Sequence, residues 1–244
     1  GSANFNILWS NVQTLVPATY SRVPHPDVSR RFKDNDPVAR VAGMILERDI
    51  EFEVQHYDDF RNTMRSCVLD RFLGGRGTAW ARYEPHIRAL PGEPVDGVQV
   101  TEDSDDPPRE ELDYECAPVD YVHAKDFGHT LARTWEEVTG VWRKVYMTKR
   151  SLEDRFGAEK AEKIPLDAQP EDYERKETSG DGDNLYRACI YEIWDKETGK
   201  AYWLSKSVKE MVDEKDDPLG LEEFFPCPKP LYASLTNESL VPVP

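Results

Sequence analysis

Two histidines and two aspartates spaced by threes are the strongest candidates for chemistry in this sequence. They are Asp120, His123, Asp126 and His129, and imidazole and carboxylate groups are common ligands of divalent metals. A metal site would need a helix that gathers them, but Pro118 and Gly128 disfavour a helix here. On a strand, a spacing of three alternates between the two faces. We therefore interpret the four as ordinary polar positions.

Two acidic groups have residue types suited to the same chemistry. Asp58 and Asp59 could join Asp70 as the carboxylates of a two-metal nuclease, but adjacent aspartates at a helix start also favour the helix dipole, which is our interpretation. The run EDSDD at Glu102–Asp106 lacks the Asp-x-Asp-x-Asp-Gly spacing and distal Glu of an EF-hand calcium loop. It predicts a solvated acidic loop.

Catalytic motifs are also missing from the sequence. It has no GxGxxG after a strand, no phosphate-binding P-loop, no HExxH and no GxSxG. The run GGRG at Gly74–Gly77 ends a predicted helix, whereas a phosphate-binding loop begins one, so we predict a helix stop and a turn. We therefore name no catalytic, cofactor-binding or metal-binding residue, and expect neither enzymatic activity nor a cofactor.

Composition indicates a folded, acidic protein. The 244 residues include six Trp, eleven Tyr and nine Phe, which indicates packed cores. No apolar run approaches the roughly 18 residues of a membrane span, so we expect no membrane partner. The net charge of −16 disfavours non-specific binding to phosphates. Two short basic patches, Arg30–Lys33 and Arg143–Lys144 with Lys149–Arg150, are interpreted as solvated faces or ion-pair partners.

The cysteines give no sign of a metal or disulfide framework. Cys67, Cys116, Cys189 and Cys227 are far apart and form no CxxC pair. We interpret them as reduced thiols of a protein in a reducing compartment.

The first half of the chain reads as mainly helical. Apolar spacing predicts a helix over Ile7–Val16 that Pro17 ends or kinks, followed by an extended stretch over Arg22–Phe32. Asp36 and Pro37 are a natural cap and first residue of the next helix. That helix carries an apolar stripe of Val38, Val41, Ala42, Ile45 and Leu46. Another helix is predicted from about Asp58 to the Gly74-Gly75 pair.

The second half reads as mainly β. A short strand is predicted in GTAWARYEP, strands and loops over 118–147, a short helix over 148–157, and a hairpin over 187–205 with Gly199 in its turn. Residues 91–113 and 165–184 predict long acidic loops. The expected fold class is α+β, with a helical hairpin packed on a mixed or antiparallel sheet. Residues 1–3 are interpreted as a tag remnant, and 4–244 as a single domain.

Several stretches, taken in order, resemble one family. They are NILWSNVQTLVPATYSRVPHPDVSRRFKDNDPVARVAGMILER, VLDRFLGGRGTAWARYEP, PVDYVHAKDFGH, ARTWEEVTGVWRKVYMTKRSLEDRFG, YEIWDKETGKAYWLS and DPLGLEEFFPCPKPLYASLTNESLVPVP. This set is similar to the portal, or head-to-tail connector, proteins of short-tailed bacteriophages and related prophages. The resemblance runs over nearly the whole chain, excluding the acidic loops.

The resemblance implies a structural virion protein. Such proteins are dodecameric rings at one capsid vertex through which double-stranded DNA is packaged and ejected. The implied partners are further copies of the chain, capsid protein, the terminase (packaging ATPase), tail adaptor proteins, and double-stranded DNA that passes without sequence-specific binding. The implied location is the virion, and the host cytoplasm during assembly. By this likeness the chain is a wing fragment, expected to be monomeric or a low-order oligomer alone, with stem, clip and crown beyond it.

Two alternatives stay open at this point. One is another virion or adaptor binding module that shares a wing-like fold but has no stem. The other is a metal-dependent hydrolase that uses the carboxylates and histidines described above.

Overall fold

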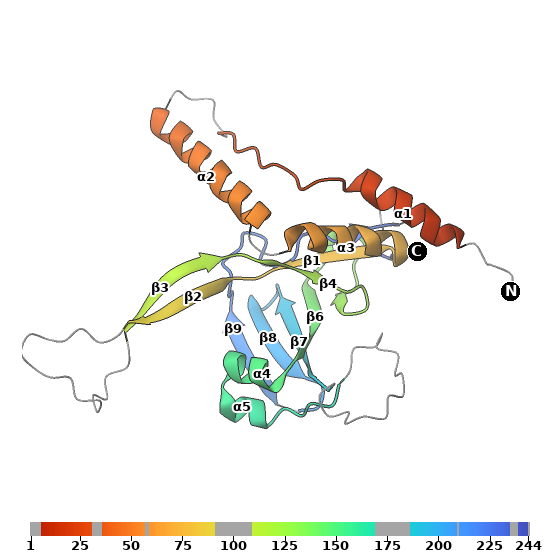
Figure 1. The fold of residues 1–244 in the computed structure, drawn as a ribbon. Helices are drawn as coiled ribbons and strands as arrows, with labels where there is room; N and C mark the ends of the chain where they lie inside the picture. Colours follow the sequence, from red (N-terminus) through yellow and green to blue (C-terminus); the bar gives the residue numbers. More distant parts are fainter. Residues whose placement is uncertain are drawn as a thin grey trace, which may run out of the picture. The chain divides into compact units, whose positions relative to one another are not determined.

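The computed structural model describes residues 6–30, 36–56, 59–90, 109–168, 186–208, 210–234 and 239–243. They form helices and antiparallel sheets, which confirms the expected α+β class (Figure 1). The chain divides into two compact units. Unit 1 comprises Gly1–Arg22, Arg61–Trp80 and Asp120–Pro244, and unit 2 comprises Val23–Phe60 and Ala81–Val119. The single domain over 4–244 stays a prediction.

A five-stranded antiparallel sheet forms the centre of unit 1. Its order is β5 (Phe127–His129), β6 (Gly140–Met147), β7 (Ala188–Asp195), β8 (Lys200–Ser205) and β9 (Met211–Asp216). On β7 every second residue is buried, as the predicted hairpin requires. Gly199 has a φ of 67° in the turn between β7 and β8, which confirms its predicted role.

Two short helices and a 3-10 turn complete this half of unit 1. Thr148 caps α4 (Lys149–Phe156), because its Oγ1 accepts a hydrogen bond from the Ser151 amide at 3.2 Å. Helix α4 ends at Gly157, as predicted, and α5 (Ala158–Glu162) follows. Leu152, Ala161 and Trp135 from η1 (Trp135–Glu137) are buried in the same hydrophobic core as the sheet residues.

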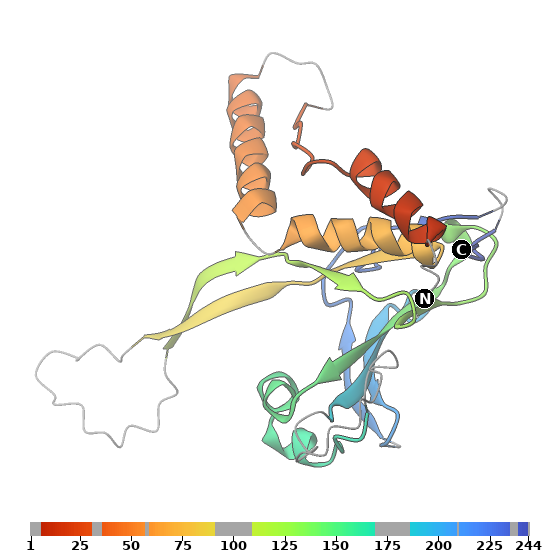
Figure 2. The same cartoon turned by 45° about the vertical axis from the view of Figure 1, so that its right-hand side comes forward.

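A second, three-stranded sheet of unit 1 has the order β10 (Leu231–Tyr232), β1 (Arg76–Ala81) and β4 (Val119–Val122). Helix α3 (Phe60–Leu73) leads into β1 through Gly75 at a φ of 75°, which confirms the predicted helix stop and turn. Helix α1 (Ile7–Thr19) packs on α3 through a small cluster of Val12, Val16 and Val68, and lies beside it in Figure 2. Pro17 lies inside α1 and does not end it.

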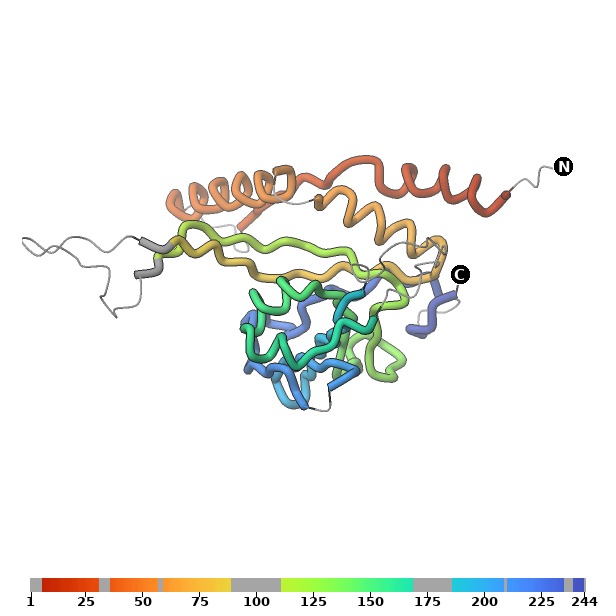
Figure 3. The backbone as a smooth tube through the Cα atoms, turned by 60° about the horizontal axis from the view of Figure 1, so that its bottom comes forward, coloured from red at the N-terminus to blue at the C-terminus, as the bar shows by residue number. Residues whose placement is uncertain are grey.

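Unit 2 consists of a helix and a hairpin. Helix α2 (Pro37–His56) begins as predicted, since the Asp36 Oδ1 accepts a hydrogen bond from the Val38 amide at 2.9 Å. Strands β2 (Glu84–Leu90) and β3 (Arg109–Cys116) pair antiparallel and run side by side in Figure 3. Before α2, residues 22–30 carry no helix or strand, in agreement with the predicted extended stretch.

The structure corrects one loop boundary. Residues 109–113 were expected in an acidic loop, but they belong to β3 and pair with β2. The acidic composition of residues 109–113 led to the loop prediction, whereas backbone pairing with β2 stabilises them as a strand. The rest of the expected loop, with the run Glu102–Asp106, lies outside the described residues. So does 169–184 of the second loop, whereas Ala168 forms a β-bridge with Arg187.

Membrane spanning can be assessed for the helices that the structure describes. None of them has both the length and the apolar character needed to cross a bilayer.

Candidate functional site

The four predicted metal-ligand candidates have separate partners. Asp120 accepts a hydrogen bond from the Arg143 Nη1 at 3.1 Å, and the Asp126 carboxylate lies 3.8 Å from the Lys144 Nζ. The Nδ1 of His123 accepts from the Lys125 amide at 3.3 Å, and that of His129 lies 2.8 Å from the Thr130 carbonyl. Over the described ranges, no three His, Cys, Asp or Glu side chains are grouped so as to hold a metal ion.

A largely buried ion-pair cluster centres on Arg143 of β6. Its Nε donates to the Glu192 Oε2 at 2.8 Å, and the side chains of the pair are 12% and 11% exposed. The other oxygen of Glu192 accepts from the Trp194 Nε1 at 3.1 Å. The guanidinium also lies over the Trp80 ring, 4.7 Å from its centroid. Each charged group in the cluster therefore has a partner of opposite charge. We interpret the cluster as part of the packing of the core.

Two side chains fix the turn between β4 and β5. The Asp70 Oδ2 accepts from the Tyr121 hydroxyl at 2.6 Å and from the Ala124 amide at 3.2 Å. From β1, the Arg76 Nη2 donates to the carbonyls of Ala124 and Phe127 at 2.6 and 2.7 Å. Asp70, a candidate nuclease carboxylate in the sequence, is therefore occupied in positioning this turn.

The remaining candidates lie apart from one another. Asp59 directly precedes α3, and Asp58 lies outside the described residues. Lys149 and Arg150 approach Glu153 and Asp154 at 3.9 and 4.0 Å, so this basic patch consists of ion-pair partners, as predicted. In the first patch the Arg30 Nη1 donates to the Asp36 carbonyl at 2.8 Å, and 31–33 lie outside the described residues.

The four cysteines are free thiols. Burial raises the pKa of Cys67 to about 11 and that of Cys227 to about 12, so both are protonated at neutral pH.

His129 makes the stability of unit 1 dependent on pH. Burial lowers the pKa of His129, and the Arg76 charge lowers it further, against the opposing hydrogen bond to Thr130. The unfolded state then binds more protons, so this contribution is complete above about pH 6.5 and is lost as pH falls toward the folded pKa. We expect urea unfolding to show a steeper loss of stability between pH 7.5 and 5 in the wild type than in His129→Gln. Equal losses in both proteins would contradict this.

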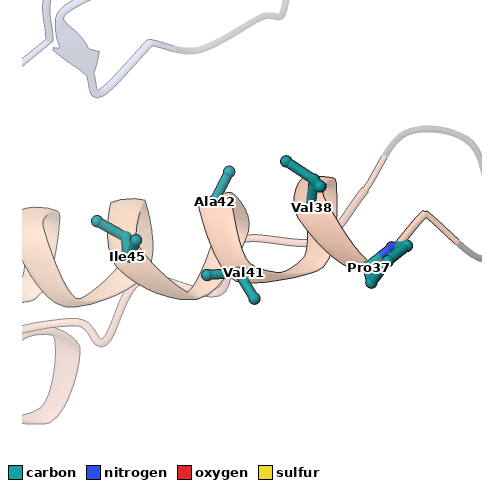
Figure 4. A pocket seen from close by; sticks show the side chains of 5 residues that line it. All are labelled: Pro37, Val38, Val41, Ala42 and Ile45. Carbon is teal, nitrogen blue, oxygen red and sulfur yellow. The ribbon is translucent and has the colours of Figure 1, made fainter.

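The most distinctive surface lies on α2. Pro37, Val38, Val41, Ala42 and Ile45, the α2 apolar face, line a shallow recess of about 460 Å³. Figure 4 shows Val38, Ala42 and Ile45 projecting along one side of the helix. Val38 is 74% exposed and Ile45 is 64% exposed. None of the 20 residues of α2 is buried, which is unusual for a helix with an apolar stripe.

The opposite side of α2 is the one that contacts its own unit. Glu47 follows Val38 by nine residues and therefore lies on the other side of the helix, at about 100° per residue. Its Oε2 accepts from the Val28 amide at 3.2 Å, and one turn later the Glu51 Oε1 lies 2.9 Å from the His25 Nδ1. Residues 23–30 thus contact the polar side of α2, while the apolar side chains of the helix are exposed.

Unit 2 also contributes nothing to a hydrophobic core in the described residues. Both core clusters consist of residues of unit 1. Of the unit 2 residues whose burial is described, Pro118 alone is buried. On the hairpin, Ile87 and Leu112 are exposed as well. A helix and a two-stranded hairpin without a core are marginal in water, so unit 2 requires a covering surface to be stable.

The sequence located the apolar stripe but not its exposure. A stripe at i, i+3, i+4 and i+7 is the usual sign of a helix packed on its own core. No sequence signal reveals this exposure, because the contacts of Glu47 with Val28 and of Glu51 with His25, which fix the side of α2 that its own unit uses, form only in the folded chain.

No protein-family model matches the chain, and no curated protein matches it.

Proposed function

We propose that this chain is a structural subunit of a portal-type head-to-tail connector, whose ring conducts double-stranded DNA into and out of a phage capsid. The observation that carries the proposal is the α2 apolar face, which is open while the polar side of the same helix is used within unit 2. An exposed apolar stripe on a helix is typical of a surface that packs on another molecule. The exposed α2 apolar face therefore suits a protein that works as part of a larger assembly.

The ordered sequence stretches that resemble portal proteins support the choice of a portal assembly. In that role the chain associates with further copies of itself in the virion, and in the host cytoplasm during assembly. Capsid protein, packaging ATPase and tail adaptor proteins are its other proposed partners. The net charge of −16 suits a conduit along which DNA slides without being gripped.

Self-association is expected to strengthen with salt. Copies that each carry a charge of −16 repel one another, whereas the α2 apolar face contains no charged residue. Raising sodium chloride from about 0.1 M to about 1 M shortens the Debye length from about 10 Å to about 3 Å and removes most of the repulsion. Sedimentation velocity at rising protein concentration should therefore show more dimer and low-order oligomer at high salt.

Two results would count against this expectation. Oligomers that dissociate at high salt would indicate contacts made by ion pairs. A single monomeric boundary at every concentration and salt level would show that the α2 apolar face makes no self-contact in the chain alone.

A further inference from the structure

Strand β10 is attached to the rest of unit 1 by few backbone contacts. Its two residues, Leu231–Tyr232, pair with Gly77 and Arg76 of β1. One further backbone hydrogen bond to the turn before β1 follows at Ala233, where the amide donates over 2.8 Å. Segments with so few contacts are among the first parts of a fold to open. Side-chain contacts must therefore help to hold β10 in place.

The side-chain contacts of β10 centre on His129 of β5. The centroid of the His129 ring lies 6.2 Å from that of the Tyr232 ring, and the two rings are nearly perpendicular. The same ring also lies 6.2 Å from the rings of Trp135 and Phe127. The Nδ1 of His129 faces the Thr130 carbonyl at 2.8 Å, so Nδ1 carries the proton of the neutral ring. Nε2 is then the atom that takes up a second proton.

The charge that acts on His129 comes from Arg76 of β1. The Arg76 guanidinium lies over the Phe127 ring, 5.0 Å from its centroid, and donates to the Phe127 carbonyl at 2.7 Å. Phe127 and Trp135 carry no charge. Burial raises the pKa of the Tyr232 hydroxyl to about 12, so this group stays neutral as well. A protonated His129 would therefore lie in a half-buried site beside a second positive charge.

We infer that His129 is an acid-sensitive latch for β10: uptake of a proton at its Nε2 releases β10 from β1, while the five-stranded sheet of unit 1 stays folded. Release lets water reach the imidazolium, and β10 is the neighbour that opens because it has only two pairs to lose. The residues before β10 stay anchored, since the Phe224 ring packs 5.4 Å from that of Trp194. This inference does not depend on the proposed function.

The direction of the pH dependence follows from the surroundings of His129. Burial and the Arg76 charge lower the pKa of His129 in the folded chain, so the released form binds the proton more tightly. The latch is therefore closed above about pH 6.5 and opens as pH falls toward the folded pKa. Because one proton is taken up, the opening equilibrium changes by at most about 10-fold per pH unit.

Hydrogen exchange followed by mass spectrometry tests the latch. Rates at about pH 7.5 and about pH 5.5, each divided by the intrinsic exchange rate at that pH, give the opening equilibrium of a peptide that contains β10. We expect this equilibrium to rise at least about 3-fold at the lower pH, while a peptide from the centre of β7 changes by less than about 2-fold. A β10 peptide that does not respond, or that responds no more than the β7 peptide, would overturn the inference.

Two histidine variants assign the response. His129→Gln keeps a donor for the Thr130 carbonyl but takes up no proton, so its β10 peptide should respond to pH no more than its β7 peptide. His123→Gln is the matched control, because His123 lies between β4 and β5 and accepts from the Lys125 amide instead. It should keep the full response of the wild type. A full response in His129→Gln would assign the effect to another group and contradict the latch.

A measurement on the unchanged protein keeps the test open if His129→Gln does not fold, which circular dichroism would show. The ring protons of His129 can be followed by NMR in the wild type as pH is lowered. The midpoint of their titration should coincide with the midpoint of the β10 exchange response, since one proton drives both. Midpoints that differ by more than about one pH unit would overturn the inference.

Discussion

Arg143→Met is expected to lower the free energy of unfolding by about 3–5 kcal/mol, the usual cost of removing one partner of a buried ion pair. The Arg143 and Glu192 side chains are both about one-tenth exposed, and the Glu192 carboxylate would keep only its hydrogen bond from Trp194. Methionine roughly fills the volume but leaves a carboxylate charge in the core. Urea denaturation followed by tryptophan fluorescence would measure the loss.

The double variant Arg143→Met/Glu192→Gln is the matched control for this prediction. Glutamine keeps an acceptor for the Trp194 Nε1 but carries no charge, so the double variant should be more stable than Arg143→Met alone. Asp120, the second partner of Arg143, is 36% exposed and can be solvated when Arg143 is lost. A loss below about 1 kcal/mol for Arg143→Met would show that the pair is hydrated in solution.

Gly77→Ala is expected to destabilise the protein by about 3 kcal/mol or more, at the upper end of overpacking costs. A Cβ at Gly77 would lie 1.8 Å from the Cys67 carbonyl oxygen and 2.6 Å from its carbonyl carbon. These are backbone atoms of α3, so no side-chain rotation can relieve the clash. The close approach explains how α3 and β1, joined by a turn at Gly75, pack directly on each other.

Gly140→Ala in β6 provides the matched glycine control. There the nearest atom to a new Cβ is the Thr130 Cγ2 methyl group at 3.3 Å, which can move by a few tenths of an ångström. The change in stability should stay within about 1 kcal/mol. Equal effects of the two substitutions would mean that α3 does not hold Cys67 against β1 in solution.

Local sequence signals predicted much of the fold. The start of α2 at Asp36-Pro37, the capped helix α4 and the β7–β8 hairpin each carry a cap, a stop or an alternating pattern within a few residues. Strand β9 was missed because it is acidic and only one of its six residues, Val212, is buried, so it carries no alternating apolar pattern. Strand β10 was missed because it pairs with residues far away in the sequence. Leu231, for example, pairs with Gly77 of β1. The β2–β3 pairing was missed for the same reason.

The exposure of the α2 apolar face could not be predicted from the sequence. Periodicity places Val38, Val41 and Ile45 on one side of a helix, but it does not say whether that side meets a core. The answer depends on which side Glu47 and Glu51 use for their contacts with residues 23–30, and these contacts exist only in the folded unit. Likewise, the spacing of Asp120 and His123 cannot show that Arg143, over 20 positions further along, neutralises the aspartate.

Negative-stain electron microscopy of the proposed portal subunit tests the central claim most directly. The claim is that this chain belongs to a ring-forming portal subunit whose α2 apolar face is covered on assembly. We expect rings of about twelve subunits with a central hole, and far fewer rings from a preparation carrying Ile45→Asp. Discrete small particles from folded wild-type protein, with no rings at any concentration, would contradict the portal assignment and favour an adaptor whose α2 apolar face binds a different protein.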